Sequence, residues 1–252
     1  MSHALADSMT LIGRSIRLSR RNVETLIMSI LLPLLMMTLF VFVFGGAINT
    51  GTAYVNYVVP GIILLCTGYG AASTAMSVAD DMSNGVVDRL RSMPVNSFAL
   101  LTGHVVASAT RNALSTTIVV VAAVLFGFRP SAGVVEWLAA AGLVLLYVLA
   151  LSWLAAALGV VAKSVESASA LSFFMLFLPY LSSAFVPPGT MPGVLRVISE
   201  HQPITPLTET VRGLLTGTPI GSNATLALAW SCGLLVGSFL LATLLYRRRT
   251  AD

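Results

Sequence analysis

Charged residues are scarce in this chain. Asp, Glu, Lys and Arg together make up 10% of its 252 residues, hydrophobic residues make up 56%, and the mean hydropathy is +0.89. Soluble globular domains carry roughly a quarter charged residues. The composition therefore excludes an ordinary water-facing domain and predicts a membrane protein.

Motifs that carry chemistry are also missing. The only two cysteines, Cys66 and Cys232, fall inside long apolar runs, which suits small buried residues better than a disulfide framework or a metal site. No pair of carboxylates, metal-ligand spacing or nucleophile arrangement indicates an enzyme embedded in the membrane. We therefore predict no metal site and no catalytic residue.

A phosphate-binding loop is absent as well. The motif G-x-x-x-x-G-K-[ST] does not occur, and the nearest string, before Lys163, has Ala157 and Ala162 where the two glycines would stand. We expect that this chain hydrolyses no ATP and binds no cofactor itself.

Long uncharged runs are present instead. About 20 apolar residues cross the hydrocarbon core as a helix. One run, Asn112 to Phe128, reaches this length if it begins near Leu101 and Arg111 extends toward the headgroups. The sequence predicts an all-α polytopic membrane protein whose six transmembrane helices form one domain, residues 26–252. The other five spans are Leu26 to Gly46, Tyr54 to Ala79, Trp137 to Ala162, Ala168 to Val186 and Ala224 to Tyr246.

Most basic residues fall on one side of this topology. Six spans place both termini on the same side, together with eleven of the fourteen basic residues. Cytoplasmic segments carry the excess of Lys and Arg, so both termini are predicted to be cytoplasmic. Topology explains the positive charge, and nothing requires a nucleic-acid partner. The eleven residues are Arg14, Arg17, Arg20, Arg21, Arg89, Arg91, Arg111, Lys163, Arg247, Arg248 and Arg249.

The stretch before the first span, residues 1–25, has the pattern of a basic amphipathic helix. Ile12 and Ile16 share one face, while Arg14 and Arg17 lie on the others. Such helices lie in the interface beside anionic lipids. We predict a cytoplasmic interface helix here, with a disordered basic tail as the alternative.

A charged segment, "DDMSNGVVDRLRSMPVN", separates the second and third spans and begins at Asp80. A helix from about Gly85 to Pro94 would carry an apolar ridge flanked by charge, with Asp80 and Asp81 toward its N-terminal end. A solvated turn is the alternative, but a bare turn needs only a few residues. We therefore predict a docking surface for a cytosolic partner. Its residues are Val86, Val87, Asp88, Arg89, Leu90 and Met93.

The connection before the last span is long and rich in proline. Pro203 divides it into two short helices. Thr205 and Pro206 fit the N-cap and first position of the second helix, which Gly217 closes. We predict that residues 187–222 form a short re-entrant or outer helical hairpin on the extracytoplasmic side.

Three stretches together resemble one family. They are "PGIILL" from Pro60, "DDMSNGVVDRLRSMPVNSFALLTGHV" and "SSAFVPPGTMPGVLRVISEHQPITPLTETVRGLLTG". They are similar to segments of the membrane permease subunits of ABC type-2 exporters, most closely the daunorubicin-resistance-type branch. His201 and Gln202 depart from the family pattern. The likeness rests on Asp80, Gly85, Arg89, Leu90, Pro94, Phe185, Pro187, Met191, Pro192, Pro203, Thr205, Arg212 and Gly217.

The resemblance implies the permease subunit of an ATP-driven exporter in a bacterial cytoplasmic membrane. It implies two copies of a cytosolic ATPase subunit, which carry ATP and magnesium, and a second permease that is either a copy of this chain or a paired homologue. Membrane lipids are further partners. The segment 80–98 would then be a coupling helix that docks in the ATPase, with the N-terminal interface helix beside it.

The resemblance also implies a substrate pathway along spans one and five, which carry aromatic residues and methionines without charge. Such a surface suits an apolar or amphiphilic cargo, such as a drug, antibiotic, lipid or glycolipid. Ordinary packing against helices and lipid is the alternative. The candidate pathway residues are Met37, Phe40, Phe44, Phe173, Phe177 and Tyr180.

An ion-coupled secondary exporter, acting without an ATPase, is the alternative function. Such carriers hold Asp, Glu or His within their spans as ion relays. Here Glu24, Glu136 and Glu166 lie at span edges, no acidic residue lies in the middle of a predicted span, and His104 lies near the start of the third. The sequence therefore favours the ABC exporter.

Overall fold

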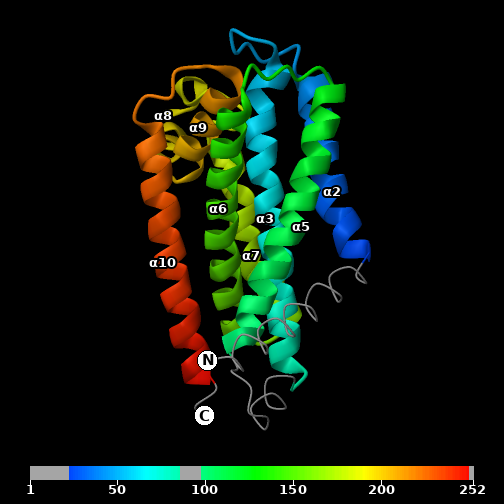
Figure 1. Ribbon diagram of the computed structural model, residues 1–252, viewed down its shortest axis with the longest axis vertical. Helices are drawn as coiled ribbons and strands as arrows, with labels where there is room; N and C mark the ends of the chain where they lie inside the picture. The colour runs from blue at the N-terminus through cyan, green and yellow to red at the C-terminus, as the bar shows by residue number, and fades with distance from the viewer. Residues whose placement is uncertain (1–22, 86–97, 250–252) are drawn as a thin grey trace.

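The computed structural model describes residues 23–85 and 98–249, and every regular element in these ranges is helical. Five helices are long and apolar enough to cross a membrane by length and composition, and they pack side by side as a bundle (Figure 1). They are α2 (Val23–Thr38) with its π-helical continuation η1 (Leu39–Phe44), α3 (Tyr54–Ser83), α5 (Phe98–Leu125), α6 (Val134–Val161) and α10 (Asn223–Arg249).

The fifth predicted span, Ala168 to Val186, holds a shorter helix. Here α7 (Val165–Phe177) continues as one 3-10 turn, η2 (Leu178–Leu181). Pro179 explains the change, since proline lacks the N–H that an α-helix needs and clashes with the preceding turn. The apolar helix Val165–Leu181 therefore ends at the lower limit of length for crossing a bilayer.

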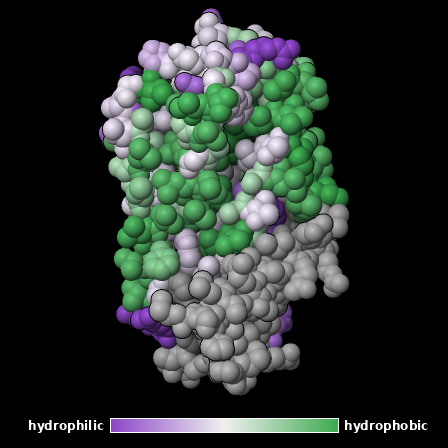
Figure 2. Space-filling view, viewed as in Figure 1, coloured by the Kyte–Doolittle hydropathy of each residue, from purple (hydrophilic) through white to green (hydrophobic). Residues whose placement is uncertain are grey.

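The two ends of the bundle differ. The end of α3 at Ser83, the start of α5 and the arginines that close α10 lie at one end, which we call the basic end (Figure 1). The short helices η3 (Pro188–Thr190), α8 (Gly193–His201) and α9 (Ile204–Thr216) lie at the other, the hairpin end. Figure 2 shows an apolar surface between them, with hydrophilic residues toward both ends, as a membrane-spanning bundle requires.

The helix α3 is the centre of the bundle. In its apolar window 83% of the residues are buried, against 17% in α10. Its glycines let neighbours approach closely: a Cβ on Gly61 would lie 2.6 Å from that of Ala184, and one on Gly68 would lie 3.3 Å from the Met175 carbonyl oxygen. Helices without a hydrophobic driving force between them associate through such close contacts. The small residues of this span therefore serve helix packing.

The third predicted span takes its longer form, because α5 runs from Phe98 to Leu125. The expectation that Arg111 extends toward the headgroups is wrong. Arg111 lies midway along α5 with only 8% of its surface exposed, and its Nη2 donates to Thr74 Oγ1 of α3 at 3.2 Å. A hydroxyl acceptor on the neighbouring helix holds the guanidinium inside the bundle.

The outer connection folds as two short helices, as predicted. Gly217 ends α9 in the left-handed conformation (φ 73°), and its N–H donates to the Gly213 carbonyl at 2.9 Å. The predicted N-cap is wrong: Pro203 precedes the first residue of α9, and Thr205 lies inside the helix. The Thr205 hydroxyl instead accepts a hydrogen bond from the N–H of Ser183 at 3.2 Å. Most of α9 is buried, whereas α8 is mostly exposed.

We expect Gly61→Ala to destabilise the protein, because the added Cβ would lie within 3 Å of three atoms of Ala184. Overpacking of this kind costs about 1–3 kcal/mol. Thermal unfolding of the purified protein should show a lower midpoint. Gly142→Ala on α6 is the matched control, since nothing lies within 4 Å of its Cβ position, and it should keep or raise the midpoint. Equal midpoints for the two variants would contradict the close packing around α3.

Candidate functional site

Six aromatic side chains form a continuous row that joins η1 to α7, and we call it the aromatic row. In spatial order they are Phe44, Phe40, Phe185, Tyr180, Phe177 and Phe173. The row brings together five of the six residues that the sequence marks as a candidate pathway. The additional member, Phe185, belongs to the outer motif of the sequence, but nothing in its spacing places it between the two predicted spans.

Stacked rings occupy the middle of the row. Phe185 lies between Phe40, at 4.3 Å between ring centroids, and Tyr180, at 5.1 Å, with interplanar angles of 25° and 14°. Beyond this centre, Phe40 contacts Phe44 at 5.6 Å, and Phe177 contacts Phe173 at 4.8 Å. These separations lie in the range in which aromatic pairs attract one another beyond their buried area.

The row is buried at its centre and exposed at both ends. Phe185 is 2% exposed, whereas Phe44, Phe177 and Phe173 are 42%, 48% and 54% exposed. The row therefore offers two apolar aromatic surfaces joined through a fixed interior. Met37, the sixth candidate pathway residue, is fully buried in the core and presents no surface to a ligand in this conformation.

Side chains of other elements hold the non-helical backbone around Phe185. The Tyr54 hydroxyl donates to the Phe185 carbonyl at 2.8 Å. Gln202 Nε2 donates to the Leu181 carbonyl at 3.2 Å, and Arg212 Nη2 donates to the Ser183 carbonyl at 2.9 Å. Backbone polar groups inside a membrane protein need such partners. The position of Phe185 thus depends on α3 and α9.

Arg212 makes the largest set of these contacts. It forms the ion pair with Glu209 that their spacing of three on one helix predicts, at 2.5 Å. Its Nε and Nη2 also donate to the Tyr57 carbonyl at 3.1 and 3.0 Å, and its guanidinium carbon lies 3.7 Å from the centroid of the Tyr57 ring. Sequence spacing alone could not show these links to α3. Arg212 therefore ties α9 to the central helix and to the aromatic row.

A buried acidic–basic pair lies at the basic end. Asp81 Oδ2 and His104 Nε2 are 2.9 Å apart, and both residues are buried. Asp80 and Asp81, which we expected toward the N-terminal end of the coupling helix, belong to the last turn of α3, so the second span is longer than the predicted Tyr54 to Ala79. The signal that could have found the pair is an acid and a histidine near the facing ends of successive spans.

The predicted coupling and interface residues lie outside the described residues. After α3 ends at Ser83, the first described range closes at Gly85, which has a φ of 67°, and the second begins at Phe98. The coupling residues outside the described ranges are Val86, Val87, Asp88, Arg89, Leu90 and Met93, and the interface residues are Ile12, Arg14, Ile16 and Arg17.

Metal-binding groups do not gather in the described part of the chain. Across residues 23–85 and 98–249, no group of three or more His, Cys, Asp or Glu side chains is placed to hold an ion. Both cysteines are free; Cys66 is buried, but Cys232 lies exposed on α10, contrary to the expectation of a buried residue.

The long apolar helices, the apolar belt and the inward-facing polar contacts define a polytopic helical membrane protein. The family model described as ABC-2 type transporter matches residues 7–216, and the chain belongs to this family.

Two relatives cover most of the chain. The daunorubicin resistance ABC transporter permease protein DrrB1 of Streptomyces coeruleorubidus is 30% identical over 98% of this chain and 88% of its own length. The probable doxorubicin resistance ABC transporter permease protein DrrC of Mycobacterium tuberculosis is 27% identical over 90% of this chain and 83% of its own length. Both relatives are thus named as permeases of drug-resistance transporters.

We expect Arg212→Met to lower the stability of the purified protein. The substitution leaves the Tyr57 and Ser183 carbonyls without these donors, and each unsatisfied buried group costs roughly 1–3 kcal/mol. A thermal unfolding curve should shift to lower temperature. Arg196→Met is the control, since Arg196 pairs with Glu200 on the exposed face of α8, and it should change the curve little. An equal shift for both variants would show that the contacts of Arg212 stabilise the protein no more than a surface ion pair does.

Proposed function

We propose that this chain is the permease subunit of an ABC exporter that moves an apolar or amphiphilic substrate, a drug, antibiotic, lipid or glycolipid, out across a bacterial cytoplasmic membrane. Membership of the ABC-2 type transporter family supports a transport role, and the drug-resistance permeases among its relatives support the substrate class. The observation that carries the substrate class is the aromatic row, which contains no charged side chain and is exposed at both ends.

The aromatic row suits an uncharged cargo for a physical reason. The faces of phenylalanine rings make dispersion and offset-stacking contacts with a flat apolar molecule, and this binding requires no charged group on the cargo. Phe177 and Phe173 present such a pair of rings at 4.8 Å on the exposed part of α7. A cargo that carries a fixed charge would leave that charge without a partner here, which is costly in an apolar environment.

The energy for export is proposed to come from a partner. The chain has no phosphate-binding loop, so ATP and magnesium would be bound by a separate cytosolic ATPase subunit in two copies, and this subunit would bind neither. A second permease, identical or homologous, completes the assembly in this proposal. Both termini would face the cytoplasm, where residues 1–25 lie against membrane lipids, and no nucleic acid takes part.

The helices on either side of residues 86–97 are suited to transmit a movement. At the basic end, Asp81 of α3 contacts His104 of α5, and farther along Thr74 of α3 accepts a hydrogen bond from Arg111 of α5. A displacement at the proposed coupling residues would therefore move α3 and α5 together. Because α3 also carries Tyr54, which bonds to the Phe185 carbonyl, the movement would reach the aromatic row.

The ion-coupled exporter remains the second candidate because of one observation. The buried Asp81–His104 pair is the kind of group that relays protons in secondary carriers. Its position in the last turn of α3 argues for a structural role, since carriers hold their coupling-ion sites near the middle of the membrane.

We expect Phe177→Ala to weaken stimulation of the ATPase by substrate in the purified complex. Removing a half-exposed ring from the aromatic row takes away one face of the proposed pathway, and the concentration of drug that gives half-maximal stimulation should rise about tenfold. Phe174→Ala is the matched control, because Phe174 lies on the same helix, is 73% exposed and is not in the row. If both variants require the same concentration of drug for half-maximal stimulation, the aromatic row is not part of the substrate pathway.

We expect Leu90→Arg to disturb assembly with the ATPase or to uncouple ATP hydrolysis from export. Burial of a leucine in a partner cleft contributes roughly 1.5–3 kcal/mol, which an unpaired arginine would forfeit. Co-purification and drug export measure the two effects, and the variant should still insert into the membrane. Arg129→Ala is the control. The Arg129 side chain lies at the hairpin end and donates to the nearby carbonyls of Val124 and Phe128, so its loss should affect neither assembly nor export. Normal assembly with normal export would make the segment a simple linker.

A further inference from the structure

Tyr69 lies at the middle of α3, the central helix of the bundle, and its side chain is partly exposed. Tyrosine is enriched at the two membrane–water interfaces, where the ring lies among apolar groups and the hydroxyl meets water. In the middle of a span no interfacial water is available, and a hydroxyl without a partner is costly there. The position of Tyr69 therefore requires a group that bonds to its hydroxyl.

The nearest such group belongs to the aromatic row. The hydroxyl of Tyr180 lies within hydrogen-bonding reach of the Tyr69 hydroxyl, and the Tyr180 ring contacts Phe185 at 5.1 Å and Phe177 at 6.1 Å between centroids. Gly68 lets α7 lie directly against α3 beside Tyr69, and the 3-10 turn η2, which carries Tyr180, also contacts α3. Tyr180 is partly exposed as well. We call these two residues the tyrosine pair.

The tyrosine pair is the polar part of an uncharged surface. The aromatic row has no charged member, and the next charged residue on the same face of α3 is Asp80, about 16 Å farther along the helix axis. A tyrosine hydroxyl both donates and accepts hydrogen bonds. When one hydroxyl of the pair donates to the other, the second proton is still available to an acceptor outside the pair.

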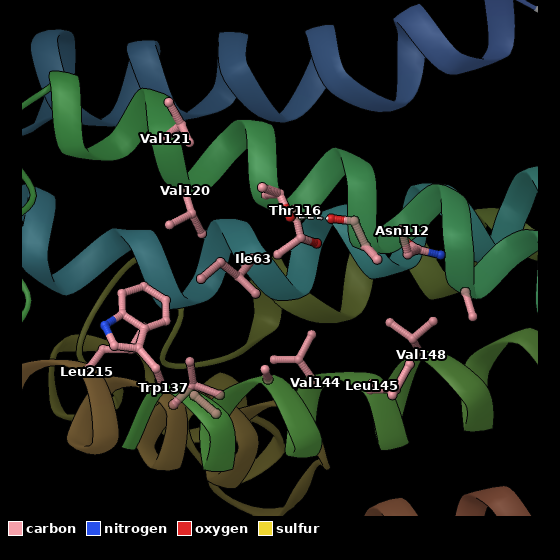
Figure 3. Close-up of a pocket in the computed structure, with 16 residues that line it drawn as sticks. Ile63, Asn112, Thr116, Val120, Val121, Trp137, Val144, Leu145, Val148 and Leu215 are labelled. Carbon is pink, nitrogen blue, oxygen red and sulfur yellow. Dashed lines mark hydrogen bonds between the residues drawn. The ribbon is translucent and has the colours of Figure 1, made fainter. Parts of the chain in front are cut away.

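A cavity of about 430 Å³ between α5 and α6 is not part of this arrangement (Figure 3). Neither tyrosine of the pair and no residue of the aromatic row lines it. Among its polar side chains, Asn112 and Thr116 hold their unpartnered oxygens in buried positions. The Thr117 hydroxyl already donates to the Ala113 carbonyl at 2.7 Å. The cavity presents mainly apolar surface and gives no basis for distinguishing molecules by a polar group.

We propose that the tyrosine pair selects cargo at the aromatic row: Tyr69 and Tyr180 together donate one hydrogen bond to an uncharged acceptor, a carbonyl or ether oxygen, on an otherwise apolar molecule. This inference rests on the proposed function, since the row must first hold the cargo. Stacking on Phe177 binds flat molecules whether or not they carry a polar group, whereas the pair distinguishes between molecules of the same shape. The preferred cargo is then a flat amphiphile that carries a hydrogen-bond acceptor.

Two flat tricyclic probes of similar shape measure this selection. Fluorenone carries one carbonyl acceptor, and fluorene carries none. The tritiated probes would be equilibrated with the full-length chain in nanodiscs, with empty nanodiscs as the blank, and affinities would refer to the probe concentration in the lipid so that partition does not enter. Fluorenone should bind saturably and about fivefold more tightly than fluorene, as one net hydrogen bond implies.

Variants that lose only an oxygen atom locate the hydrogen bond. Tyr69→Phe combined with Tyr180→Phe removes both hydroxyls and keeps both rings, so it should weaken fluorenone binding about fivefold and leave fluorene binding unchanged. Tyr57→Phe is the matched control, because Tyr57 is partly exposed on the same helix but lies against Arg212, outside the row, and it should keep the preference. Ala113→Phe, which fills the cavity, should change neither affinity.

The outcomes separate the tyrosine pair from the row. Equal affinities for the two probes in the native chain, or a preference for fluorenone that persists in the double variant, would overturn the role of the pair. The proposed pathway would still stand in that case if Phe177→Ala weakens binding of both probes. Binding that is lost in Ala113→Phe would place the probes in the cavity and would also overturn the role of the pair. If neither probe binds saturably, or if Phe177→Ala changes neither affinity, the pathway itself fails, and the selection fails with it.

Discussion

Close approach of neighbouring backbones to α3 is the constraint on which the other features depend. In an apolar solvent no hydrophobic force drives helices together, so contacts at short range and hydrogen bonds must hold the bundle. Gly61 and Gly68 allow the segment around Ala184 and the helix α7 to lie directly against α3. Gly159 of α6 likewise packs against Ala75 and Val78 of α3. Because these contacts bring the backbones together, Phe185 lies between the rings of Phe40 and Tyr180.

Hydrogen bonds from polar side chains add to the close packing of the helices. Arg212 satisfies carbonyls of α3 and of the segment before α8, while Arg111 reaches a hydroxyl of α3 from the middle of α5. Ser152 of α6 bonds to Ser108 of α5 at 2.8 Å. Each contact joins different elements inside the bundle, so the same interactions that stabilise the fold also connect the basic end to the aromatic row. This is why we assign transmission of movement to α3 and α5 rather than to α10, whose apolar window is mostly exposed.

Run length and local signals were sufficient for much of the fold. Five uncharged or nearly uncharged runs became long helices, and Gly217 closed α9, because these features depend on local chain chemistry. The depth of a side chain depends on its neighbours in space, so spacing alone could not show the inward position of Arg111. The places of Asp81 and His104 near the facing ends of successive spans made their pairing possible, but only the structure shows the contact. Five rings of the aromatic row followed from the family resemblance, but the place of Phe185 between them required the structure.

The source of energy is the central claim, and reconstituted vesicles test it most directly. The chain would be inserted with and without its ATPase partner, and drug accumulation would be measured with ATP, with a proton or sodium gradient, and with Asp81→Asn in place of the native residue. The account predicts accumulation only with both the partner and ATP, no response to a gradient, and retained transport in Asp81→Asn protein that remains folded. Gradient-driven accumulation by the chain alone, lost in Asp81→Asn, would contradict it.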